Sequence, residues 1–404
     1  MGMARFEAFR GTSYVPGKVD PDDVIAPPYD VVNAAERSHL AARSPYNAIH
    51  VELPEPAGSL DRYASAAALF TQWHSDSAVA VATVPTLYVY RMTFTDESGS
   101  ARSTTGVLGA LGLDPTHSGE VLPHEETTSK DKSDRLSLLR AARTNFSPIW
   151  GLSTAAGLAE ACSEAAAAIE EAGGSSWRAT DEDGVVHETW AVTDAGHLSA
   201  IAEAVASGPV LIADGHHRYE TACAYLEEQP GSVGATAVLA FVVELVEEQL
   251  SVRAIHRLLS GVEPVALPAQ LTAHFAVEPA PSDAFELQAS LVDKGALGLL
   301  TANGNWYLTP SEELVEAAGA DLDSSRLAYA LDDLGIEDVR FQHGVADVLA
   351  AVESGEAAAA VLLRPVSVER IAETARGGRR MPPKSTFFHP KPRTGMAFRE
   401  LDEA

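Results

Sequence analysis

Cysteine is scarce in this chain of 404 residues, which contains only Cys162 and Cys223. Two cysteines exclude a disulfide-rich scaffold, and neither has another cysteine near it in sequence to form a zinc knuckle. Uncharged apolar runs of about 18 residues are absent, so we expect no transmembrane helix. A basic start followed by an apolar run is absent as well, so we expect no signal peptide and a cytoplasmic protein.

Basic residues are also few, because 29 Lys and Arg stand against 57 Asp and Glu and give a formal net charge of −28. A protein that neutralises many phosphates needs a basic surface, so we expect no nucleic-acid partner. The composition, 46% hydrophobic and 21% charged, is that of an ordinary globular protein. At roughly 150 residues per domain, the length suggests two or three domains.

The spacing of apolar residues predicts alternating helices and strands after an irregular first segment of 55 residues rich in proline and tyrosine. The expected helices are 59–79, 133–144, 154–172, 195–207, 219–228, 326–334, 345–354 and 368–376. The expected strands are 86–94, 103–111, 185–192, 209–213, 237–244, 298–301, 305–308 and 358–363. A Pro- and Ala-rich stretch at 264–281 is the best candidate for an internal boundary.

These elements predict an α+β protein with mixed sheets and helices. We expect three parts, which are an N-terminal α+β part at 1–150, a core at 151–263 and a C-terminal α/β part at 264–404.

The strongest local signal is a box of polar residues directly after the strand 209–213. It comprises Asp214, Gly215, His216, His217 and Arg218. A helix that begins here presents free backbone N–H groups, which attract anions, and glycine lets a ligand approach the backbone closely. Arg218 would bind phosphate oxygens, the two histidines would donate or transfer protons, and Asp214 would hold Mg²⁺. The box therefore predicts a nucleotide phosphate site.

Two further segments are rich in groups that carry chemistry. In the first, Glu125 is a candidate base for a substrate hydroxyl, with the adjacent Glu126 open as the alternative base, and His124 and Arg135 are candidates for substrate binding. In the second, Lys384 and the hydroxyls of Ser385 and Thr386 lie among stiffening prolines and suit an anion. A Walker A loop, a Gly-x-Gly-x-x-Gly turn and a His-Glu-x-x-His pair are all absent.

The box resembles the signature of the ParB/sulfiredoxin-type nucleotide-binding fold, in the form found in the archaeal free-serine kinases. The resemblance implies that 151–263 forms a ParB/sulfiredoxin-like nucleotide-binding core. It covers about fifteen residues.

Motifs along nearly the whole chain resemble those of the bacterial and archaeal domain-of-unknown-function family 1015. They are Ala26-Pro27-Pro28-Tyr29-Asp30-Val31, Asn47 with His50, His124-Glu125 with Thr127, Asp134-Arg135-Leu136, Asn145-Phe146-Ser147-Pro148-Ile149, residues 213–222, His256-Arg257, and Pro383-Lys384-Ser385-Thr386-Phe387-Phe388 with Pro390-Lys391. The chain departs from the family at His389, where tyrosine is expected, and at 253–255. The resemblance implies cytosolic metabolism near serine biosynthesis and no specific reaction.

The residues and the resemblance together favour a kinase that uses ATP or ADP with Mg²⁺ to phosphorylate the hydroxyl of free L-serine, giving O-phospho-L-serine. In this hypothesis Arg218, His216, His217 and Lys384 neutralise the phosphates, Asp214 holds Mg²⁺ and Glu125 deprotonates the hydroxyl. The alternatives are a non-catalytic nucleotide-binding regulator and a phosphatase of a small phosphorylated metabolite. The sequence is compatible with a homodimer.

Overall fold

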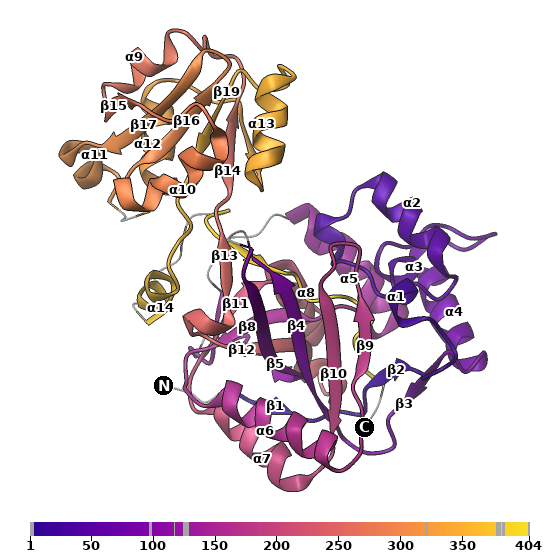
Figure 1. The fold of residues 1–404 in the computed structure, drawn as a ribbon. Coiled ribbons are helices and arrows are strands. Elements are labelled where there is room, and N and C mark those ends of the chain that lie inside the picture. Colours follow the sequence, from indigo (N-terminus) through magenta and orange to yellow (C-terminus); the bar gives the residue numbers. More distant parts are fainter. Residues whose placement is uncertain are drawn as a thin grey trace. The chain divides into compact units, whose positions relative to one another are not determined.

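The computed structural model describes residues 4–96, 99–116, 118–123, 129–319, 322–376, 381 and 384–402. Within these residues the chain forms two compact units, whose elements are labelled in Figure 1. The first unit comprises Met1–Ser251, Ala372–Arg380 and Pro390–Ala404, and the second comprises Val252–Ile371 and Met381–His389, so far as they are described. Each unit has its own sheet and its own hydrophobic core.

A mixed sheet forms the centre of the first unit. Its described strands are β1 (Phe6–Glu7), β4 (Leu87–Thr95), β5 (Ala101–Gly112), β6 (Val121–Pro123), β8 (Ile149–Ser153), β9 (Trp177–Thr180), β10 (Val186–Val192), β11 (Val210–Asp214) and β12 (Ala237–Glu244). They lie in the order β6-β11-β8-β12-β5-β4-β10-β9, with β1 beside β5. The pairs β6–β11 and β8–β12 are parallel and the remaining neighbours are antiparallel.

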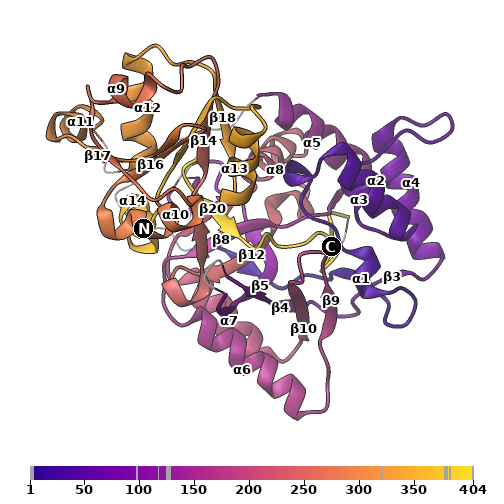
Figure 2. The same cartoon turned by 45° about the horizontal axis from the view of Figure 1, so that its top comes forward.

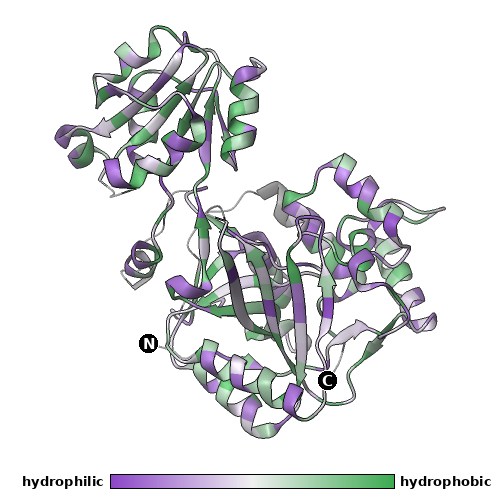
Figure 3. Ribbon diagram, in the orientation of Figure 1, coloured by the Kyte–Doolittle hydropathy of each residue, from purple (hydrophilic) through white to green (hydrophobic). Residues whose placement is uncertain are grey.

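Two helices, α6 (Leu158–Glu171) and α7 (Ala195–Ala206), lie side by side against one face of this sheet (Figures 1 and 2). Their apolar faces, with Leu158, Cys162 and Ile201, pack on the sheet residues Val89 and Val107. Figure 3 shows green and purple segments alternating along both helices, as expected of helices with one buried face.

A second core in this unit is built by short helices near the N-terminus. They are α1 (Pro21–Val24), α2 (Ala34–Arg43), α3 (Ile49–Glu52) and α4 (Arg62–Ser75). The core contains Trp73, Phe70 and, from the far end of the chain, Phe398. Helices α5 (Ser129–Ala142) and α8 (His216–Glu228) lie next to each other beside it (Figures 1 and 2). The pairs β2 (Thr12–Tyr14) with β3 (Val79–Val81) and β7 (Thr144–Asn145) with β21 (Arg399–Glu400) complete the unit.

The first 55 residues are more ordered than the sequence analysis expected. Helix α2 begins with a capping box, in which the Asn33 side chain accepts from the backbone of Glu36 and the Glu36 side chain accepts from the backbone of Asn33. The helix buries only Leu40, so its apolar periodicity is weak and the cap is the better sequence signal.

The second unit is a three-layer structure around an antiparallel sheet. Its described strands are β14 (His256–Leu259), β15 (Phe275–Pro279), β16 (Leu297–Thr301), β17 (Gly304–Pro310), β18 (Val339–Gln342) and β19 (Ala359–Leu362), in the order β15-β17-β16-β19-β14-β18. One core joins the sheet to α9 (Leu267–Leu271), α11 (Glu312–Ala317) and α12 (Asp323–Asp333), and another to α10 (Ala284–Lys294) and α13 (Val345–Glu353). The strand pair β13 (Ser251–Arg253) with β20 (Phe387–His389) and helix α14 (Val368–Arg376) stand outside the sheet.

The α+β class with mixed sheets is confirmed, but the chain divides differently from the three expected parts. The expected boundary near 150 falls inside the first unit, because β4 and β5 pair with β10 and β12. The stretch 264–281 contains α9 and β15, and β15 pairs with β17 inside the second unit. Proline therefore punctuates short elements there instead of separating domains. Among the described helices, none has the length and apolarity needed to cross a bilayer.

Gly106 in β5 tests the packing of the central sheet. A Cβ at this position would lie 2.3 Å from the backbone oxygen of Val242 on the adjacent strand. The clash is with backbone, so it cannot be relieved by a change of side-chain rotamer. We expect Gly106→Ala to lower the free energy of unfolding by about 1–3 kcal/mol in urea titrations. Ser103→Ala, at an exposed position of the same strand, is the control and should change it by less than about 0.5 kcal/mol. Equal stability of both variants would show that the two strands are not packed in this way.

Candidate functional site

The predicted strand–glycine–helix box forms in the structure. Strand β11 ends at Asp214, Gly215 adopts a left-handed conformation with φ of 86°, and α8 begins at His216 with no side chain capping its first turn. A Cβ on Gly215 would lie 3.0 Å from Nε of Arg218, so the guanidinium folds back over the start of its own helix. Gly215 is required both by its backbone angle and by this close approach.

Two cations hold the carboxylate of Asp214. Arg218 Nη2 donates to Asp214 Oδ2 at 2.8 Å, and the ammonium of Lys391 pairs with Oδ1. The three side chains are between 9% and 12% exposed. Burial by itself would raise the pKa of Asp214, but the charges of Lys391 and Arg218 outweigh it and hold the pKa well below its ordinary value. The carboxylate is therefore ionised and fixes both cations in place.

Arg218 keeps one donor without a partner. Its Nη1 donates to the backbone oxygen of Pro148, whereas its buried Nε makes no hydrogen bond to any described residue. A buried donor without a partner costs about 1–3 kcal/mol. Its position at an uncapped helix start makes it available to an anionic ligand.

Next to this guanidinium is a small cavity of about 50 Å³. Its described lining residues are Glu52, Arg135, Leu138, Leu139, Thr144, Asn145, Phe146, Ser147, Arg218, Thr221 and Val238. The hydroxyl of Thr221, one turn after Arg218 in α8, is buried and has no partner among the described residues. Two of the lining residues thus carry a buried polar atom that has no partner among the described residues, which suits a polar ligand or water.

A buried carboxylate, Glu52 at the end of α3, lines the same cavity with 2% of its side chain exposed. Its Oε1 accepts from the hydroxyl of Ser147 at 2.8 Å and lies 4.0 Å from Nη1 of Arg135. Arg135 also donates to Asp134 and to the backbone oxygen of Glu52, and its guanidinium stacks on the ring of Tyr29 at 4.2 Å. The structure therefore places the predicted residue Arg135 beside the box.

Not all predicted site residues gather here. His216, buried, and His217 occupy the first turn of α8. His124 and Glu125 lie outside the described residues. Lys384, Ser385 and Thr386 belong to the second unit, and the partner residues that the structure gives for them, Arg257 and Ser324, lie in that unit as well.

Three residues of the site were missed as site residues in the sequence, namely Tyr29, Glu52 and Lys391. Tyr29 and Lys391 lie within motifs of the family, Ala26–Val31 and Pro390-Lys391, which was the signal that could have found them. Glu52 had no such signal, because only the packing of α3 against α5 and the 145–148 segment makes it a buried carboxylate in a cavity.

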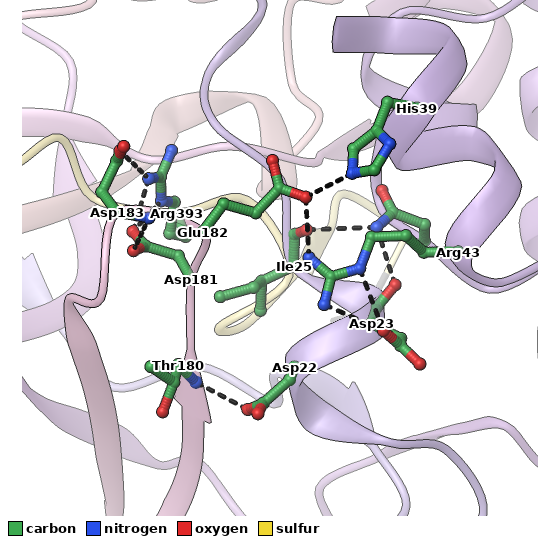
Figure 4. A network of polar contacts seen from close by, with 11 residues as sticks. Asp22, Asp23, Ile25, His39, Arg43, Thr180, Asp181, Glu182, Asp183 and Arg393 are labelled. Carbon is green, nitrogen blue, oxygen red and sulfur yellow. Dashed lines mark hydrogen bonds and ion pairs between the residues drawn. The ribbon is translucent and has the colours of Figure 1, made fainter.

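A second polar cluster lies elsewhere in the first unit (Figure 4). Arg393 binds Asp181 and Asp183, and Arg43 binds Asp23 and Glu182, beside a cavity of about 110 Å³. The carboxylate of Asp181 also forms a hydrogen bond with Nε2 of buried His187, and Nδ1 of the same ring forms one with the hydroxyl of Tyr90 at 2.7 Å. The donors and acceptors of this network are matched to each other, so it fastens the β9–β10 hairpin to α1, α2 and the C-terminal segment.

The described residues offer a poor site for Mg²⁺. Among them, no group of three His, Cys, Asp or Glu side chains is placed to hold a metal ion. Asp214, the predicted ligand, directs both oxygens at cations. Mg²⁺ usually binds one or two carboxylates together with substrate phosphates, and a carboxylate already neutralised twice does not fit that role.

The fold and this box define an α+β protein with a strand–glycine–helix turn at Asp214–Arg218. A family model described as a protein of unknown function, DUF1015, matches residues 6–331. The chain therefore belongs to the DUF1015 family. No curated protein matches it.

Solved structures resemble the chain at low identity. A conserved hypothetical protein from Pyrococcus furiosus is 14% identical, with 70% of this chain and 91% of that chain covered and a TM-score of 0.37. A free serine kinase in complex with AMP is 13% identical, with 69% and 86% covered and a TM-score of 0.38. SbnI with a C-terminal truncation, from Staphylococcus aureus, is 13% identical, with 71% and 85% covered and a TM-score of 0.39. The likeness is one of fold.

The depressed pKa of Asp214 predicts a specific acid sensitivity. The ion pairs stabilise the folded state above the unfolded-state pKa of about 3.9, and this stabilisation is lost as the pH falls toward the lower folded-state pKa. Below about pH 4, this one group contributes a slope of about 1.4 kcal/mol per pH unit. Asp214→Asn should lose that slope and should be less stable at neutral pH, because Arg218 and Lys391 lose the carboxylate that they share. Urea titrations from about pH 7 to pH 3 measure both effects, and an unchanged slope would contradict an ionised Asp214.

Proposed function

We propose that this protein is a nucleotide-dependent phosphotransferase that phosphorylates the hydroxyl of a small metabolite. The observation that carries the proposal is the buried Nε of Arg218 at the uncapped start of α8, which has no partner in the described part of the chain. A terminal phosphate bound there would accept hydrogen bonds from Nε–H of Arg218 and from the first backbone N–H groups of the helix. ATP or ADP, with free L-serine as the acceptor, are the first compounds to test, because the box resembles that of the free-serine kinases.

Charge alone does not select phosphate at this site. Arg218, Lys391 and Arg135 are balanced by Asp214, Glu52 and Asp134. The site would instead recognise phosphate through donors held in fixed positions, which need no reorganisation when the ligand binds. We propose Lys391, which is 12% exposed and paired with Asp214, as the lysine of this site, a role that the sequence analysis gave to Lys384.

The reaction also needs a group that accepts the proton of the acceptor hydroxyl. The hydroxyl oxygen of the acceptor forms a bond to the terminal phosphorus of the nucleotide. The bond from that phosphorus to the leaving group, ADP from ATP or AMP from ADP, breaks, and the hydroxyl proton passes to a carboxylate. Glu125 remains the proposed base from the sequence. Among the described carboxylates, Glu52 lines the cavity beside Arg218 and is the structural alternative. Either carboxylate favours a kinase over a pure nucleotide-binding regulator, which needs no base.

The phosphate box is tested by Arg218→Lys, which keeps a charge near Asp214 but removes Nε and the planar fork. We expect nucleotide affinity to fall about ten- to hundredfold in isothermal titration calorimetry with ATP and ADP. Arg140→Lys is the matched control, because Arg140 also binds a carboxylate, Glu228 of α8, but lies at the exposed surface. Unchanged affinity in Arg218→Lys would remove phosphate binding from this box.

The base is tested by Glu125→Gln and Glu52→Gln, with Glu126→Gln as the neighbouring control. Loss of a general base lowers turnover about 10²–10⁴-fold and leaves nucleotide affinity nearly unchanged. Each protein is assayed with ATP, then ADP, against serine and a panel of other alcohols, and its folding is checked by thermal denaturation. The substitution that lowers turnover by this amount without changing nucleotide affinity identifies the residue that acts as the base. Nucleotide binding without turnover in the wild type would favour the regulator, and release of phosphate from phosphoserine would favour the phosphatase.

A further inference from the structure

The second unit contains a buried guanidinium that no carboxylate of the described residues neutralises. Arg257 in β14 is 6% exposed. Its Nη1 donates to the backbone oxygen of Ile255, its Nη2 donates to the backbone oxygen of Lys384 at 3.2 Å, and its plane lies on the ring of Phe341 at 4.5 Å. No ion pair joins Arg257 to a described acidic residue. A buried cation without a counter-charge is costly unless a ligand supplies one.

The topology brings other anion-binding groups to the same end of the sheet. Strand β14 begins at His256, opposite Gln342 at the end of β18, and β19 ends close by, where the backbone N–H of Leu363 donates to Nδ1 of His256. The next residue, Arg364, donates to Asp323 at the start of α12. The first turn of α12 has no side-chain cap, and its Ser324 hydroxyl contacts that of Ser385 at 3.1 Å.

The segment that carries Lys384 closes this cluster. Lys384 adopts a left-handed φ of 59°, which is uncommon outside glycine, and directs its carbonyl to Arg257. Two residues further on, the hydroxyl of Thr386 is buried and has no hydrogen-bond partner among the described residues. Thr386 is 9% exposed. The segment that contacts Arg257 therefore also carries a buried hydroxyl with no partner among the described residues, a combination that suits an anionic ligand.

The electrostatics of the neighbouring groups agree with a positive environment. Burial and then the charges of His343 and Arg257 lower the pKa of His256 to about 4. Burial lowers the pKa of Arg257 to about 10. Asp323 is matched by Arg364, with Arg326 at 3.9 Å, and so is not available to Arg257. In a chain with a net charge of −28, a local cluster of this kind attracts small anions.

We propose that Arg257, the hydroxyls of Ser385 and Thr386 and the uncapped start of α12 form a second anion site, which binds a phosphate group. A guanidinium fork, hydroxyl donors and backbone N–H groups match the several oxygens of phosphate. The phosphate is either free or carried by a metabolite. This site lies within the second unit and does not depend on the proposed reaction at Asp214–Arg218.

Hydrogen exchange with inorganic phosphate tests the site at the level of peptides. In the wild type, phosphate should slow exchange of backbone amides at 323–327 and 384–387. Thr386→Val preserves the shape of the side chain and removes a hydroxyl that has no partner, so it should melt at or above the wild-type temperature. Its phosphate affinity at these peptides should fall about tenfold or more.

Thr394→Val is the matched control, because the Thr394 hydroxyl is also buried without a partner but lies in the first unit. It should bind phosphate at 323–327 and 384–387 as the wild type does. Arg257→Gln should abolish the protection there, whereas Arg218→Lys should leave it unchanged, which separates this site from the nucleotide box. Absence of protection in the wild type, or equal protection in Thr386→Val, would overturn the proposal. Serine phosphate and citrate, tested in parallel, distinguish a phosphorylated metabolite and a carboxylate from free phosphate.

Discussion

The ion pairs of Asp214 with Arg218 and Lys391 are the interaction on which the candidate site depends. They join the end of β11, the first turn of α8 and the C-terminal segment at a single buried carboxylate. Breaking a buried pair costs about 3–5 kcal/mol, because the remaining charge stays desolvated. The same carboxylate therefore stabilises the first unit and holds the Arg218 guanidinium over Gly215, where its Nε has no hydrogen-bond partner among the described residues.

The C-terminal segment is a structural part of the first unit and contributes to its site. Thr394 exchanges backbone hydrogen bonds with Ala26, and Phe398 exchanges them with Thr12. Arg399 pairs with Asn145 in a short sheet, and Phe398 packs in the core with Trp73. The pairs Ala26–Thr394 and Thr12–Phe398 join residues more than 350 positions apart, so residues from both ends of the sequence build this unit. Lys391, which pairs with Asp214, lies just before these anchored residues.

The two units handle charge in different ways. In the first, each cation of the candidate site is matched by a carboxylate, and two buried donors, Arg218 Nε and Thr221 Oγ1, have no partner among the described residues. In the second, the described partners of buried Arg257 are carbonyl oxygens and an aromatic ring. Cations that are already paired with carboxylates orient a ligand through their hydrogen-bond donors, whereas a cation without a carboxylate partner attracts an anionic ligand through its net charge.

The sequence by itself determined the local elements and the box. The strand before Asp214, the glycine with positive φ and the helix after it follow from a short run of residues, since hydrophobic periodicity and glycine chemistry act over a few positions. The α+β class and the membership of the family followed from the same kind of signal. The weak apolar periodicity of α2 did not predict a helix, although the residues of its capping box are present in the sequence.

Only the tertiary structure decided which distant residues meet. The pairing of β5 with β12 placed the expected boundary near 150 inside one sheet, and strand pairing of this kind depends on the whole fold. The burial of Glu52 beside Arg135 arises from packing between separate helices. Lys384 and Lys391 lie in one basic segment but have different partners. The backbone carbonyl of Lys384 accepts from Arg257, whereas the ammonium of Lys391 pairs with Asp214. Spacing along the sequence carries no information about such contacts, because an ion pair is set by distance in space.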